Sequence, residues 1–91
     1  SFVSNTAQIN NFVSINDNTT ISDEVIIFDN CSIGPNVTIK KNTKIYPNCS
    51  ISNSTIGENC IIGSFVIIKN SLIGNNVNIK VYILRQVERI N

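Results

Sequence analysis

The sequence predicts an all-β fold, a left-handed parallel β-helix of about five triangular coils built from hexapeptide repeats. Three observations lead to this prediction. Isoleucine returns every six residues through the first half of the chain, and asparagine recurs at corner positions with the same period. Later, two shortened coils of 17 residues follow each other directly. We expect the β-helix to span residues 1–80, and a C-terminal tail or cap to span residues 81–91.

The isoleucine column is unbroken and follows Val3 in phase, at Ile9, Ile15, Ile21, Ile27, Ile33, Ile39, Ile45 and Ile51. Two residues before each member stands a small or β-branched residue, such as Ala7 or Val13, which we also expect to face inward. Three residues before, asparagine recurs at positions 18, 30, 36, 42 and 48. Asparagine tolerates the left-handed backbone conformation that a sharp corner needs. Each hexapeptide therefore predicts one short strand and one corner.

Three hexapeptides close a triangular coil of about 18 residues, and successive coils stack at the roughly 4.8 Å spacing of hydrogen-bonded strands. After residue 51 the column continues at steps of five or six, through Ile56, Ile62, Ile68, Ile73 and Ile79. The two five-residue steps fall in "SNST" and "KNSL", one coil apart. Because both coils are shortened at the same corner, Ile56 should stack on Ile39, and Ile73 on Ile56. This spacing supports a three-sided coil independently of the steps of six.

Beyond residue 80 the pattern changes. Arg85 occupies the next inward position, whereas Ile83, Leu84, Val87 and Ile90 follow helical spacing. We expect a short helix or irregular cap there, over the open end of the stack, where strand edges would otherwise be exposed. Since the chain starts with Ser and contains no Met, we expect it to be a fragment or a processed product.

Composition and charge argue against several classes of partner. Seven basic and six acidic residues leave a net charge of +1 with no like-charge run, so we expect neither a nucleic acid nor a membrane as partner. No apolar stretch approaches the roughly 20 residues of a membrane span. The start "SFVSNTAQIN" is too polar for a signal peptide. We therefore expect a soluble, cytoplasmic chain.

The three cysteines, Cys31, Cys49 and Cys60, all occupy the small inward column two residues before an isoleucine. The chain has no CxxC pair and no His to complete a zinc site, so packing of buried thiols explains them better than metal binding or redox chemistry. Their odd number also fits free thiols in a reducing compartment.

No residue of the chain suggests catalysis. The usual general base near neutral pH is His, which is absent, and the acidic residues are scattered over corners and the tail. The glycines in "IGPN", "IGEN" and "IGNN" lack the spacing of phosphate-binding loops. Thr20, Thr38 and Thr55 form an outward ladder without the second threonine column that ice binding needs, and a solvated β face explains them. We assign no catalytic, cofactor-binding or metal-binding residue.

The segment "IGPNVTIKKNTKIYPNCSISNSTIGENCIIGSFVIIKNSLIGNNVNI", residues 33–79, carries a resemblance to known families. It resembles the β-helix of the bacterial bifunctional N-acetylglucosamine-1-phosphate uridyltransferase/glucosamine-1-phosphate acetyltransferase, in which similar "NSxIG" corners recur. It is also similar to the β-helix of the catalytic subunit of eukaryotic translation initiation factor 2B. The acetyltransferase family implies a trimer that binds acetyl-coenzyme A and a sugar phosphate between neighbours, with a His as base. Where that family has a Gly-Pro-aromatic segment ending in Arg, this chain has "KVYILRQ", and the resemblance implies that the catalytic His would lie beyond residue 91.

Two hypotheses for the function follow. In the first, the chain is the scaffold portion of a hexapeptide-repeat sugar or sugar-nucleotide acyl- or nucleotidyltransferase. The parent enzyme would then use acetyl-coenzyme A or an acyl carrier as donor, and this chain alone would be inactive. In the second, the chain is a non-catalytic β-helix assembly module of a larger complex, initiation factor 2B-like or dynactin-like. Flanking sequence with a His-bearing coil would favour the first.

One side of the triangle presents large apolar residues outward, namely Ile26, Phe28, Tyr46 and Ile61. The other two sides present mostly Ser, Thr, Lys and Gly. An apolar patch on a soluble protein usually marks an interaction surface. We therefore expect a homo-oligomer, a trimer if the family resemblance holds, with this side at its contacts. The alternative is that the C-terminal tail, or the rest of a parent chain, covers these side chains.

Overall fold

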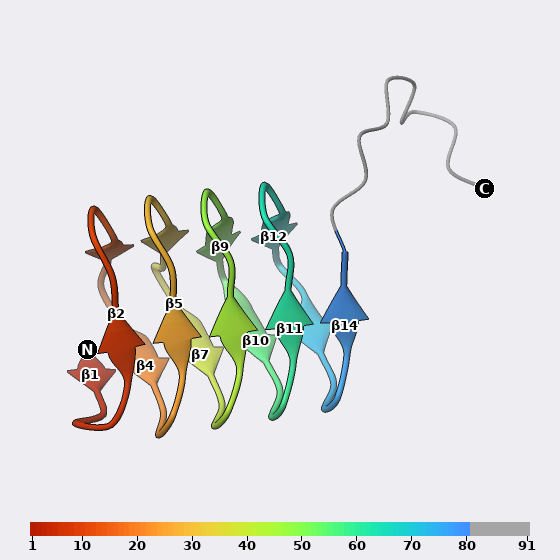
Figure 1. Ribbon diagram of the computed structural model, residues 1–91, viewed down its shortest axis with the longest axis horizontal. Helices are drawn as coiled ribbons and strands as arrows, with labels where there is room; N and C mark the ends of the chain where they lie inside the picture. Colours follow the sequence, from red (N-terminus) through yellow and green to blue (C-terminus); the bar gives the residue numbers. More distant parts are fainter. Residues whose placement is uncertain (81–91) are drawn as a thin grey trace.

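The computed structural model describes residues 1–80, and the chain in this range winds as a parallel β-helix (Figure 1). Its strands are only two or three residues long, and the described residues form no helix. Fourteen strands in this range make four complete three-strand coils and two strands of a fifth. The all-β prediction is confirmed, and the arrangement is compatible with the left-handed hexapeptide type. The cap expected over residues 81–91 lies outside the described residues.

Three parallel sheets form the sides of the triangle. Sheet A consists of β1 (Phe2–Val3), β4 (Thr19–Ile21), β7 (Val37–Ile39), β10 (Ser54–Ile56) and β13 (Leu72–Ile73). Sheet B consists of β2 (Gln8–Ile9), β5 (Ile26–Ile27), β8 (Lys44–Ile45), β11 (Ile61–Ile62) and β14 (Asn78–Ile79). Sheet C consists of β3 (Ser14–Ile15), β6 (Ser32–Ile33), β9 (Ser50–Ser52) and β12 (Ile67–Lys69). In Figure 1 the sheet B strands stand in a row along the stack of coils, with β14 at the far end from the N-terminus.

Residues with a positive φ between 47° and 67° turn the chain at its corners, and nine of these twelve non-glycine residues are asparagines. Asparagine also links the coils through its side chain. The amide of Asn18 donates a hydrogen bond of 2.6 Å to the side-chain oxygen of Asn36, whose own amide donates one of 2.9 Å to Asn53. The prediction that asparagine occupies the corners is therefore confirmed. Asparagine suits these positions both because it tolerates a positive φ and because its side chain hydrogen-bonds to the next coil.

The shortened coils keep their register as predicted. Ile39 pairs with Ile56, and Ile56 pairs with Ile73, in neighbouring strands of sheet A. Only Asn53 separates β9 from β10, whereas three residues separate β6 from β7. Shortening the corner thus leaves the inward isoleucines stacked.

The isoleucine column forms the core. Its central members, from Ile21 to Ile62, have no exposed surface, and the small inward column packs beside them. Ile9, Ile15, Ile73 and Ile79, in the outer coils, point inward but are only partly buried. A coil at the end of a stack has a neighbour on one side only, which explains the difference within the described residues.

The polar residues of the inward column have hydrogen-bond partners. The Thr43 hydroxyl donates to the carbonyl oxygen of Gly57 at 2.7 Å and accepts from the backbone N–H of Cys60 at 3.1 Å. The Ser54 hydroxyl donates to the carbonyl oxygen of Ser52 at 2.7 Å. Residues 1–80 hold no buried side-chain nitrogen or oxygen without a partner. Small hydroxyl residues can therefore replace Val or Ala in this column without leaving a buried polar group unpaired.

Candidate functional site

The sheet B face is the strongest candidate for a functional surface. It comprises the outward residues Gln8, Asn10, Ile26, Phe28, Lys44, Tyr46, Ile61, Gly63, Asn78 and Lys80. At its centre the rings of Phe28 and Tyr46 stack, with centroids 4.9 Å apart and planes inclined by 18°. Because one coil separates these residues, the coil spacing itself sets the ring spacing. The structure thus brings together two of the four residues that the sequence predicted for this surface.

The other two predicted residues, Ile26 and Ile61, are not neighbours on this face. Ile26 and Ile61 both pair with Lys44, which lies in the strand between them. The methylene stem of a lysine can cover apolar surface while its ammonium group stays in water. The sheet B face is therefore an aromatic stack beside a row of isoleucine, lysine and isoleucine.

Large apolar side chains are also exposed elsewhere, which the sequence reasoning missed. The fully apolar residues with the largest exposed fractions are Phe12 at 83%, Leu72 at 80%, Phe65 at 69%, Ile67 at 68% and Phe2 at 61%. Three of them lie on sheets A and C, so the expectation that those sides are mostly polar was incomplete. Phe12 and Phe65 occupy corner positions with φ values of 59° and 61°. The period would have located both, because each stands three residues before an inward isoleucine.

A hollow of about 330 Å³ lies at the C-terminal end of the sheet B face. Its walls come from Tyr46, Ile61, Gly63, Ser64, Asn78, Ile79 and Lys80. Gly63 occupies the place in its coil that Phe28 and Tyr46 occupy in theirs, because its N–H bonds to Ile79 as theirs bond to Ile45 and Ile62. Since Gly63 has no side chain, the aromatic stack stops at this coil and space remains above it.

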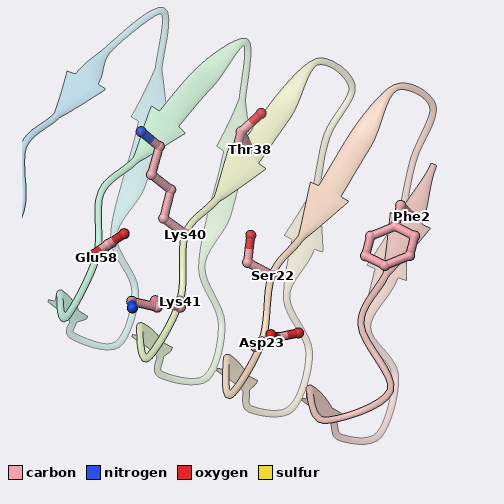
Figure 2. Close-up of a pocket in the computed structure, with 7 residues that line it drawn as sticks. All are labelled: Phe2, Ser22, Asp23, Thr38, Lys40, Lys41 and Glu58. Carbon is pink, nitrogen blue, oxygen red and sulfur yellow. The ribbon is translucent and has the colours of Figure 1, made fainter.

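A second hollow, of about 480 Å³, lies over sheet A and its neighbouring corner (Figure 2). Asp23, Lys41 and Glu58 stand at equivalent corner positions of successive coils, so the charge alternates along the stack. Asp23 accepts a hydrogen bond from the Ser4 hydroxyl. Figure 2 shows Thr38 on β7 and Lys40 directly after that strand. Alternating charges of this kind balance one another along a solvated face, and the arrangement assigns no ligand to the hollow.

The predicted threonine ladder is present but short. Thr38 pairs with Thr20 on one side and with Thr55 on the other. The ladder ends at Phe2 and Leu72, which pair with Thr20 and Thr55. The ladder is thus bounded by apolar residues at both ends.

The three thiols are buried and free, as their column predicted. The thiol of Cys49 donates a hydrogen bond to the carbonyl oxygen of Gly63 at 3.0 Å, and that of Cys60 donates to Gly74 at 3.1 Å. The neighbouring Cys31 side chain, together with burial, raises the pKa of the Cys49 thiol. A protonated thiol is a poor nucleophile and a poor metal ligand, so packing explains Cys49.

Residues 1–80 hold no group of three or more His, Cys, Asp or Glu residues that could ligate a metal ion. The same part of the chain has no helix long and apolar enough to cross a membrane. Neither hollow combines an apolar channel for an acyl donor with a histidine base, so we derive no acyl-transfer step from the described residues.

The repeat and the fold define a class of protein, the hexapeptide-repeat β-helix domains. Within this class the chain belongs to the GMPPB C-terminal domain family, whose model matches residues 15–87. No curated protein matches the chain significantly. The similarity to the bifunctional uridyltransferase/acetyltransferase and to initiation factor 2B therefore stays a resemblance. Membership of a hexapeptide-repeat family is established.

Among solved structures, the chain is similar to the acetyltransferase domain of PglB from Neisseria gonorrhoeae FA1090 in complex with acetyl coenzyme A. The identity is 15% and the TM-score is 0.41. The match covers 87% of this chain and 47% of that one, so the chain spans about half of that domain's length.

Proposed function

We propose that this chain is the non-catalytic β-helix part of a hexapeptide-repeat sugar or sugar-nucleotide transferase, and that it holds copies of the protein together. The observation that carries the proposal is the outward stack of Phe28 on Tyr46. Aromatic side chains are enriched among the residues that dominate binding at protein interfaces. The match to the GMPPB C-terminal domain family supports the link to transferases.

Catalysis by this chain alone is not part of the proposal. The sequence contains no His, and acyl or nucleotidyl transfer would be carried out by other residues of the parent protein. Acetyl-coenzyme A or an acyl carrier would serve as donor to that parent. The role proposed for residues 1–80 is to present the sheet B face at a fixed geometry, which a rigid stack of coils does well.

Three copies with parallel coil axes are the proposed assembly. The alternative is an assembly module of a larger complex, like those of initiation factor 2B or dynactin, in which a different protein covers the sheet B face. The same aromatic stack favours both, since it marks a contact surface and does not by itself identify the partner.

Light scattering after size exclusion tests the proposal. We expect the wild type to have three times the chain mass of 10.0 kDa, and the double variant Phe28→Glu, Tyr46→Lys to have the mass of one chain. The matched control is Thr20→Glu, Thr38→Lys, which places the same charges on neighbouring strands of sheet A and should leave the mass unchanged.

Circular dichroism must show that each variant keeps its strands. A wild type with the mass of one chain, at concentrations up to the highest soluble one, contradicts self-assembly and favours the larger complex. A charged sheet B variant with unchanged mass refutes the interface.

A further inference from the structure

Two columns of side chains run along the edge where sheet B meets sheet C, and their aromatic residues alternate. The first column, on the sheet B face, contains Asn10, Phe28, Tyr46 and Gly63 in successive coils. The second column, at the corner, contains Phe12, Asn30, Asn48 and Phe65 in the same coils. Each of the first four coils therefore carries one aromatic ring at this edge, on the face in the second and third coils and at the corner in the first and fourth. Three of the four phenylalanines of the chain lie in these columns.

The corner rings of Phe12 and Phe65 stand at backbone positions that favour asparagine. Phe12 and Phe65 have φ values of 59° and 61°, a conformation unfavourable for a bulky residue. The same corner holds Asn30 and Asn48 in the coils between them, so the sequence could have used asparagine throughout. Phe12 is 83% exposed and Phe65 is 69% exposed, so neither ring gains much burial within its own chain. Glu24 shares this backbone conformation, but a large apolar ring kept exposed where asparagine would fit points to a contact for the side chain.

In the two coils whose corner residue is Phe, the face column has no aromatic ring, because it contains Asn10 in the first coil and Gly63 in the fourth. Tyr46 has Phe28 on one side of its ring, and on the other side lies the hollow above Gly63. Beyond Phe28 in the opposite direction lies Asn10, whose side-chain oxygen accepts a hydrogen bond of 3.2 Å from Gln8 in the same coil. The stack of Phe28 and Tyr46 thus ends at the hollow above Gly63 in the fourth coil and at the small side chain of Asn10 in the first coil. These are the coils in which the corner residue is Phe.

We propose that a second copy of this chain supplies these rings. In an assembly with parallel coil axes at equal height, Phe65 of one copy stacks on Tyr46 of its neighbour, in the space above Gly63. Phe12 of the same copy stacks on Phe28 of that neighbour, beside Asn10. Each interface then contains a continuous stack of four rings, of which the face supplies the inner pair and the neighbouring corner the outer pair.

This inference rests on the proposed self-assembly and adds its register and direction. A contact between the corner of one copy and the face of the next joins two different surfaces, so it forms a ring where the rotation between neighbours closes and an open filament where it does not. Equal height requires a rotation axis parallel to the coils, without translation. A cyclic trimer satisfies both conditions.

The test moves a ring from the corner to the face. Phe65→Asn removes the corner ring and installs the residue found at Asn30 and Asn48, so the fold is kept and backbone strain is relieved. We expect the concentration for half-assembly to rise about tenfold, because a largely exposed Phe loses its buried place in the interface. Gly63→Phe should weaken assembly similarly, because its own ring fills the space that the neighbour's Phe65 needs. The double variant Gly63→Phe, Phe65→Asn should restore assembly to within about threefold of wild type, because its fourth coil repeats the pattern of the second and third.

Glu24→Asn is the matched control. It relieves a positive φ of 60° at the corner between sheets A and B, away from the proposed contact, and should leave assembly unchanged. An unchanged half-assembly concentration in Phe65→Asn, or a double variant weaker than either single variant, overturns the inference. If the inference fails in this way but the double variant Phe28→Glu, Tyr46→Lys is monomeric, self-assembly through the sheet B face stands and only the corner contact is wrong. A monomeric wild type overturns both.

Discussion

Replacing Ile39 with Ala tests the core of the β-helix at a fully enclosed position. Ile39 has no exposed surface and lies in register between Ile21 and Ile56 of the coils on either side. The substitution removes three carbon atoms, and their transfer contributes about 2.4 kcal/mol at roughly 0.8 kcal/mol each. The hole cannot close easily, because backbone hydrogen bonds of 3.0 Å from Ser22 and Lys40 fix the spacing of these three coils. With the cavity term we expect a total loss of about 3–4 kcal/mol, inside the usual range for such substitutions.

Urea unfolding followed by far-ultraviolet circular dichroism measures this loss, and Ile67→Ala is the matched control. Ile67 is 68% exposed on sheet C, so the same atoms should cost less than about 0.5 kcal/mol there. A loss below about 0.5 kcal/mol for Ile39→Ala would refute the assigned core. A largely helical spectrum of the wild type would refute the fold itself.

Three further predictions concern the corners, the thiols and the chemistry of the chain. Asn36→Ala should destabilise the fold by about 1 kcal/mol more than Asn36→Gly in the same unfolding assay, because only Ala resists the φ of 59°; equal losses would contradict the corner assignment. Cys31, Cys49 and Cys60 should react slowly with a thiol reagent in the native state and completely in urea, and fast native labelling would show that they are not enclosed. The purified chain should transfer no acetyl or acyl group to amino sugars, since it contains no His; turnover that persists through further purification would overturn that expectation.

The inward columns could be predicted from the sequence because periodicity determines them. A step of six or five residues identifies every inward isoleucine and every corner, and it also fixes the register of the shortened coils. Residue type alone was a weaker guide. Phe12, Glu24 and Phe65 adopt the same left-handed conformation as the corner asparagines, although their chemistry does not favour it. Stacking against neighbouring coils overrides local preference at these three positions.

The degree of exposure could not be predicted in the same way. Ile9 and Ile79 belong to the inward column but are only partly buried, because burial depends on the number of covering coils and not on sequence phase. On the sheet B face, the sequence identified Phe28 and Tyr46 as outward neighbours, but the ring separation of 4.9 Å is a property of the coil spacing. The hollow above Gly63 follows from a missing side chain, which becomes informative only once its stacked neighbours are known.

Hydroxyl-radical footprinting over a range of protein concentrations tests the central claim, that the chain assembles through the sheet B face, most directly. Mass spectrometry reports the oxidation of each aromatic ring, and Phe2 on sheet A, 61% exposed, serves as the internal control. Our account predicts that Phe28 and Tyr46 become protected as concentration rises, whereas oxidation of Phe2 stays constant. Protection of Phe2 with Phe28 and Tyr46 unchanged, or no concentration dependence at any ring, would contradict it.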